Sequence, residues 1–115
     1  MTVNEAISLA TQSCPHTLER DKLILWLGGI EERIATELTH REPLSVGEQD
    51  GEKILTAPDA YAQLYPAYLM MMRELECADS DRYTFYCSAF CGEYERYARH
   101  VIRSRLAQSE PIRLI

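Results

Sequence analysis

Residues 83–101 read YTFYCSAFCGEYERYARHV, and this stretch decides the fold. Its apolar and aromatic residues recur at alternating spacings of four and three, the period of one face of a long helix. Asp79-Ser80-Asp81 stands directly before it and suits a helix start, because short polar side chains cap free amides there. The sequence predicts a helix from about Asp79 to about Leu106. The positions of its seam are Tyr83, Cys87, Phe90, Tyr94, Tyr97 and Val101.

The expected helix is long for so small a protein. About 25 residues at 1.5 Å each give a rod of roughly 37 Å. We therefore expect part of the helix to project from the domain or to pack on another subunit. The tail from Gln108 to Ile115 contains Pro111 and ends in apolar residues. We expect this tail to be extended or to dock in a groove.

Two helices are expected near the N-terminus. Thr2 and Glu5 have the spacing of a capping box, and Cys14-Pro15 ends the helix that follows. A second helix is expected from between Thr17 and Glu19 to about His40, because apolar residues recur at spacings of three and four. That stripe consists of Leu23, Trp26, Leu27, Ile30, Ile34 and Leu38.

The remaining pattern is interrupted in several places. Gly28-Gly29 lies inside the second helix, where it either permits a kink or a close helix approach or is a tolerated weak spot. Residues 41–57 contain proline, glycine and charged residues and read as a loop, with Lys53–Thr56 as a short extended piece. A third helix is expected over Asp59–Ala78, and Pro66 indicates either a later start or a kink.

Composition places the chain among small globular proteins. Its 115 residues are 46% apolar and 26% charged, which fits one domain over residues 1–115. The predicted fold class is all-α, with about four helices in a small bundle, a long C-terminal helix and a loop at about 41–57. No apolar run could span a membrane and the first residues lack a signal-peptide pattern, so we expect an intracellular protein.

Charge is distributed unevenly along the chain. The net charge is −6, which argues against general nucleic-acid binding because phosphate contacts need a cationic face. Residues 96–115 hold five arginines and one acid, a net of +4, so the remaining residues carry −10. An acidic body with a basic end suits head-to-tail contact between identical subunits, which produces rings when the rotation closes.

Tyrosine is the unusual residue. The chain has seven tyrosines and two phenylalanines, and every tyrosine falls on the last two expected helices. Because tyrosine combines contact area with a polar tip, we favour an interface role over a core whose rims use tyrosine. Arg96, Arg99 and Arg103 share a face, where they either balance the helix dipole or contact an acidic partner or DNA phosphates. The candidate interface residues are Tyr61, Tyr65, Tyr68, Tyr83, Tyr86, Arg96, Arg99 and Arg103.

No motif indicates catalysis, so we expect neither an enzyme nor a cofactor. The spacing of the four cysteines lacks a zinc knuckle, and cysteine on an apolar helix face is more often a small buried hydrophobe than a metal ligand. Glu31-Glu32 and Glu74-x-Glu76 read as solvated helix faces. The histidines are scattered and no glycine-rich phosphate loop is present. The cysteines, expected to be reduced, are Cys14, Cys77, Cys87 and Cys91, and the histidines are His16, His40 and His100.

The chain resembles the small phage and prophage head–tail connector, or adaptor, proteins. The resemblance rests on Thr2–Ala6, Asp21–Leu27 with Ile30 and Ile34-x-x-Glu37, Tyr61-x-x-Leu64-Tyr65-x-x-Tyr68-Leu69, Asp79-x-x-Arg82-Tyr83 and Phe90-x-x-x-Tyr94.

This resemblance implies an all-helical structural protein of virion assembly that forms a ring between portal and tail and uses no cofactor. Homo-oligomers of about a dozen subunits are expected by analogy. The implied partners are portal and tail-module proteins, with neither membrane nor nucleic acid among them. The implied location is the host cytoplasm, and the virion after assembly. The alternative is a small prophage regulatory or DNA-associated helical protein, whose arginine face would contact phosphates.

Overall fold

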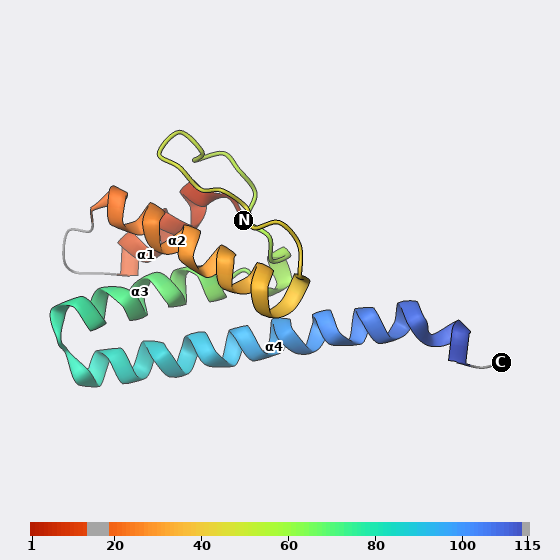
Figure 1. Cartoon of the computed structure of the whole chain (residues 1–115). Coiled ribbons are helices and arrows are strands. Elements are labelled where there is room, and N and C mark those ends of the chain that lie inside the picture. Colours follow the sequence, from red (N-terminus) through yellow and green to blue (C-terminus); the bar gives the residue numbers. More distant parts are fainter. Residues whose placement is uncertain (14–18, 114–115) are drawn as a thin grey trace.

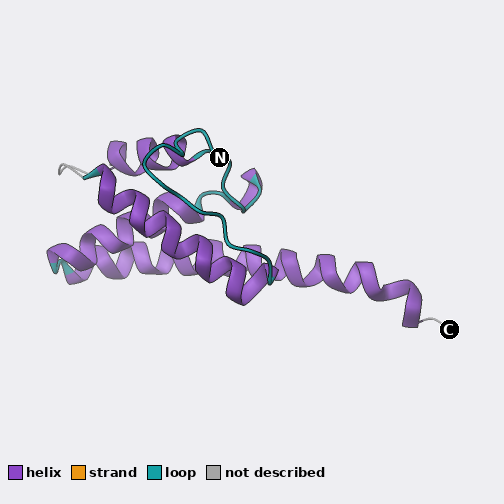
Figure 2. Cartoon of the chain, turned by 45° about the horizontal axis from the view of Figure 1, so that its top comes forward, coloured by secondary structure: helices purple, strands orange, loops and turns teal. Residues whose placement is uncertain are grey.

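The computed structural model describes residues 1–13 and 19–113. Helix α3 lies at the centre, with α4 antiparallel along one side of it and α1 and α2 on the other (Figures 1 and 2). The predicted all-α bundle with a long C-terminal helix is confirmed. The elements in chain order are α1 (Val3–Ser13), α2 (Arg20–Ile34), a π-helical turn (Ala35–Thr39), a 3-10 turn (Asp59–Tyr61), α3 (Leu64–Cys77) and α4 (Ser80–Arg113).

Helix α1 begins with the predicted capping box. The Thr2 amide donates to Oε1 of Glu5 at 3.0 Å, and the Glu5 amide donates to Oγ1 of Thr2 at 3.2 Å. These two bonds satisfy amides that a helix start leaves without partners. Helix α1 extends to Ser13. The predicted stop at Cys14-Pro15 and the predicted start of the next helix at Thr17 lie outside the described residues.

Helix α2 and the π-helical turn together occupy the span predicted for the second helix. The helical stretch ends at His40, which takes the left-handed conformation with φ 53°. Among the described atoms, none lies within 4 Å of a Cβ built on Gly28, and only Tyr68 Oη, at 4.0 Å, approaches one built on Gly29. No described helix therefore needs these glycines for close packing. This favours the interpretation that Gly28-Gly29 is a tolerated weak spot in the helix.

The loop between Thr39 and Asp59 is bonded to the start of α1. The Val3 amide donates to the Lys53 carbonyl at 3.0 Å, and the Leu55 amide donates to the Met1 carbonyl at 2.9 Å. Thr2 and Ile54 form an isolated antiparallel bridge, so the predicted short extended piece is confirmed. These bonds hold the second half of the loop next to the start of α1.

Helix α3 starts at Leu64, so the prediction of a continuous helix from Asp59 is wrong. Pro66 explains the later start, because a proline is tolerated in the first helical turn, where its missing N–H costs no bond. Asp59–Tyr61 form a separate 3-10 turn instead. Of the two alternatives for Pro66, the structure shows the start close to it.

Helix α4 buries the predicted seam, with Phe90 2%, Tyr94 8% and Tyr97 3% exposed. The helix continues to Arg113, so its predicted end near Leu106 and the predicted extended tail are wrong for residues 108–113. Residues 105–108 are Arg, Leu, Ala and Gln, all strong helix formers, which accounts for the continuation. At 34 residues the helix is about 51 Å long, and its last part extends beyond the other helices (Figure 1). The expected projection is confirmed.

Replacing Ala78 with glycine is expected to stabilise the fold by about 1 kcal/mol. Ala78 connects α3 to α4 with φ 57°, a left-handed conformation that strains a residue with a Cβ. Its amide and that of Asp79 donate to the Leu75 and Glu74 carbonyls, so the turn must keep this shape. Urea unfolding measures the change. The matched control is Ala89→Gly, on the exposed surface of α4, which should lower stability by about 1 kcal/mol. Loss of stability in both variants would contradict the prediction.

Candidate functional site

Glu31 is a fully buried carboxylate, with 1% of its surface exposed. The prediction that Glu31-Glu32 forms a solvated face is therefore wrong for Glu31, although Glu32 is exposed. The physical reason is helical position: Glu31 follows Leu27 by four residues and precedes Ile34 by three, which places it on the apolar stripe of α2. That spacing is the signal that could have identified it.

Hydrogen-bond donors surround this carboxylate. The Tyr65 hydroxyl donates to Oε1 of Glu31 at 2.5 Å, and the Thr56 amide and hydroxyl both donate to Oε2, the amide at 3.3 Å. The Ala57 amide in turn donates to the Tyr65 hydroxyl oxygen at 2.8 Å. Burial raises the pKa of the Tyr65 phenol far above its usual range, and the charge of Glu31 raises it further, so the phenol stays a donor. The network joins α2, α3 and the loop.

Tyr65 cannot serve as an interface residue in this structure, because its side chain is fully buried and bonded to Glu31. Glu74 likewise differs from its predicted solvated state. It is 3% exposed and accepts a hydrogen bond from Nε of Arg82 at 3.0 Å, which joins α3 to the first turn of α4. Both residues therefore stabilise the fold from inside rather than contact a partner.

A second set of contacts fixes the end of α2 against α4. The Tyr94 hydroxyl donates to Oε1 of Glu37 at 2.6 Å, and Nε of Arg33 donates to the same atom at 3.0 Å. Hydrogen bonds from Tyr94 and Arg33 lower the pKa of the Glu37 carboxyl. The Arg33 guanidinium also lies over the Tyr94 ring, 4.6 Å from its centroid. These contacts hold the π-helical turn against α4 at Tyr94, close to where α4 extends beyond the other helices.

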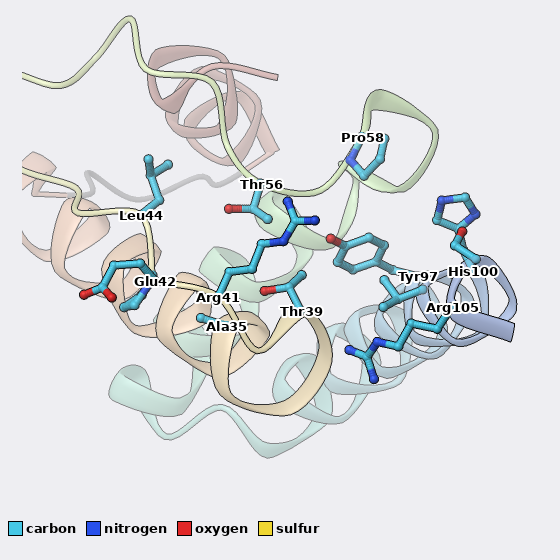
Figure 3. A pocket seen from close by; sticks show the side chains of 13 residues that line it. Ala35, Thr39, Arg41, Glu42, Leu44, Thr56, Pro58, Tyr97, His100 and Arg105 are labelled. Carbon is cyan, nitrogen blue, oxygen red and sulfur yellow. The ribbon is translucent and has the colours of Figure 1, made fainter. Parts of the chain in front are cut away.

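A pocket of about 470 Å³ lies at that place, and we name it the root pocket (Figure 3). The π-helical turn, the loop and the middle of α4 build it. Apolar, hydroxyl-bearing and charged side chains all contribute to its lining. Its lining residues are Ala35, Thr39, Arg41, Glu42, Pro43, Leu44, Thr56, Pro58, Tyr97, His100, Val101, Ser104 and Arg105.

The root pocket has a cationic bias in an acidic protein. Among the described residues, neither Arg41 nor Arg105 forms an ion pair, and Glu42 is the one carboxylate in the lining. Figure 3 shows the Arg41 side chain reaching into the space between Thr56 and Tyr97. Such a site can bind an anionic group beside apolar surface.

Tyr61 and Arg96, both predicted as interface residues, lie beside this pocket. The Tyr61 ring stacks on His100 with centroids 4.9 Å apart, and it lies 5.7 Å from the Tyr97 ring. The Arg96 guanidinium lies 5.3 Å from the Tyr61 centroid and pairs with Glu93 at 2.9 Å. His100, a pocket residue, had no sequence signal, because only the fold brings the loop next to it.

The other candidate tyrosines do not form one continuous surface with Tyr61. Tyr68 is half-buried against Phe90, with centroids 5.1 Å apart. Tyr83 and Tyr86 are half-buried near the start of α4. Since 14 residues of helix span about 21 Å, Tyr83 lies far from the root pocket.

Arg99 and Arg103 are exposed on the outer side of α4, and Arg99 lies 3.8 Å from the Glu95 carboxylate. Further along the same helix, Ile102 and Leu106 remain 52% and 54% exposed. This projecting part of α4 thus presents both cations and apolar side chains to its surroundings. The arginines were predicted from the sequence, whereas the two apolar residues were not.

The cysteines differ in their burial. Cys77 and Cys91 are exposed, so the expectation of buried small hydrophobes is wrong for them, whereas Cys87 is half-buried and packs against the core. All three are free thiols, whereas Cys14 and His16 lie outside the described residues. In the part of the chain that the structure describes, no group of three His, Cys, Asp or Glu side chains is placed to hold a metal ion. No helix of that part is both long and apolar enough to cross a membrane.

No family model, curated protein or solved structure matches this chain.

Proposed function

We propose that this chain is a structural assembly protein that self-associates through the projecting part of α4, in the manner of the head–tail connectors that its sequence resembles. One observation carries the proposal: Ile102 and Leu106 stay half-exposed on a rod that extends past the protein's own core. Fully burying a side chain of this kind contributes about 1.5–3 kcal/mol, and these half-exposed residues leave roughly half of that unused in the monomer. A second copy that covers this surface recovers it.

Charge supports self-association as well. The last 20 residues carry net +4 and the remaining residues −10, so unlike ends of two copies attract each other. Under this proposal the further partners are the portal and tail-module proteins of a phage particle. Assembly needs neither a catalytic group nor a cofactor.

Light scattering after size-exclusion chromatography tests the proposal. The wild-type chain is expected to form oligomers, and the double variant Ile102→Ser/Leu106→Ser is expected to be monomeric. The matched control is Leu25→Ser, which removes a 71% exposed leucine from α2 and should leave the oligomer intact. A wild-type chain that stays monomeric at high concentration would contradict self-association. If the double variant still forms the same oligomers, Ile102 and Leu106 are not part of the self-association surface.

The alternative, a prophage regulatory or DNA-associated protein, has weaker support. Its arginine face would bind phosphates, yet Arg96 already pairs with Glu93 and Arg99 with Glu95. Phosphate-bound proteins lose affinity steeply as salt increases. Salt-sensitive binding of the chain to duplex DNA would favour this alternative over an assembly role.

A further inference from the structure

We infer that the root pocket receives the carboxylates of Asp21 and Glu48 from a second copy, so that copies join head to tail. This inference rests on the proposed self-association and names the charged part of that interface. It extends the contact surface from the exposed apolar residues of α4 to the adjoining root pocket, which Arg41 and Arg105 help to line.

The pocket supplies cations without carboxylate partners. Arg33, Arg82 and Arg96 each donate to a carboxylate within 3.0 Å, whereas among the described residues Arg41 and Arg105 have no such partner. A guanidinium binds a carboxylate through two parallel hydrogen bonds, which makes an acidic side chain the ligand of matching geometry. The hydroxyls around the pocket add further donors. They belong to Thr39, Tyr97 and Ser104.

The exposure of the pocket favours a protein surface over a small molecule. Pockets for small ligands bury most of the ligand's area. Here Arg41, Pro58 and Arg105 are all exposed, and the apolar floor is limited to a few side chains such as Val101. An open, cationic depression of this kind suits an acidic protrusion from a folded partner.

Asp21 and Glu48 supply an exposed acidic pair for this role. Both are exposed, and they come from different segments, the first turn of α2 and the loop. The neighbouring Asp21 carboxyl raises the pKa of Glu48, and the Arg20 guanidinium lowers it less. Adjacent carboxylates repel each other, and guanidinium groups from another molecule relieve that repulsion.

The two surfaces lie at opposite ends of the same helical segment. Asp21 is in the first turn of α2, and Thr39, which lines the pocket, ends the π-helical turn that continues it. Eighteen residues of helix separate them by roughly 27 Å, so they cannot meet within one chain. Contact between them therefore requires a second copy, and in the head-to-tail arrangement that we infer it generates rings or filaments of copies. In that arrangement the projecting part of α4 extends along the neighbouring copy.

Charge-reversal variants of the full chain test the inference. Variant A is Arg41→Glu/Arg105→Glu, and variant B is Asp21→Arg/Glu48→Arg. Each alone is expected to weaken self-association at least about tenfold, because like charges then meet at the interface. An equimolar mixture of A and B is expected to restore it, since every contact again joins opposite charges. The matched control is Arg103→Glu, a cation on α4 outside the pocket, which should change the association constant little.

The outcomes separate this inference from the proposed function. Circular dichroism first confirms that A and B remain helical. Oligomers that depend on Ile102 and Leu106 but persist in A would overturn the pocket inference and leave self-association intact. If variants A and B each self-associate weakly and also fail to associate when mixed, the two surfaces do not pair with each other. A monomeric wild-type chain would overturn both proposals.

Discussion

Replacing Glu31 with alanine is expected to lower the free energy of unfolding by about 2–3 kcal/mol. The variant removes the acceptor of three hydrogen bonds, two from Thr56 and one from Tyr65. Water does not reach the Tyr65 hydroxyl easily, because that side chain is 0% exposed. A buried donor without a partner costs its full desolvation free energy. Urea unfolding followed by circular dichroism measures the loss as a lower midpoint at similar slope.

The adjacent residue provides the control. Glu32→Ala removes the same charge from an exposed position on the same helix and should change stability by less than about 0.5 kcal/mol. Equal effects of the two variants would show that helix charge, and not the buried network, sets the loss. Combining Glu31→Ala with Tyr65→Phe should cost less than the sum of the single changes, because both remove the same hydrogen bond.

The fold was largely predictable because its signals are local. The capping box at Thr2, the start at Asp79 and the seam from Tyr83 to Val101 each specify a helix through neighbours within a few residues. The end of the last helix was predicted too early. The helical run past Leu106 reflects good helix formers that outweigh Pro111 in its last turn.

The buried carboxylates show where sequence reasoning failed. Glu31 and Glu74 were interpreted by residue type, since acids are rarely buried. Their spacing from Leu27 and Met70 placed them on inward faces, but the donors that make burial tolerable come from other elements of the fold. Tyr65, which bonds Glu31, is 34 residues away. A solvated acid and a satisfied buried acid therefore look alike until the partner is known.

The candidate site was predictable only in part. Arg96 and Tyr61 were selected from composition, and the fold does bring their side chains together. Arg41 and Arg105 had no distinguishing pattern, because the pocket they share forms only when the loop lies beside α4. The tyrosine count indicated an interface without its location. Four of the five candidate tyrosines are half-buried, which is compatible with either packing or contact.

Replacing Phe90 with alanine is expected to lower the free energy of unfolding by about 3–5 kcal/mol, the largest effect we predict for one substitution. Phe90 is 2% exposed at the middle of the α4 seam. Its ring contacts the rings of Tyr68 and Tyr94, at centroid distances of 5.1 and 5.5 Å, and the Arg33 guanidinium lies 5.7 Å from its centroid. Truncation leaves a cavity between α3, α4 and the end of α2. Thermal and urea unfolding measure the loss.

The second phenylalanine of the chain is the matched control. Phe85 lies on the same helix but is 67% exposed, so Phe85→Ala should change stability by less than about 1 kcal/mol. The five-residue step from Phe85 to Phe90 turns the helix by about 140°, so the pair reports which face of α4 packs inward. Equal losses would mean that α4 is rotated about its axis. Tyr97 and Val101 would then face elsewhere, and the root pocket that they help to line would not form.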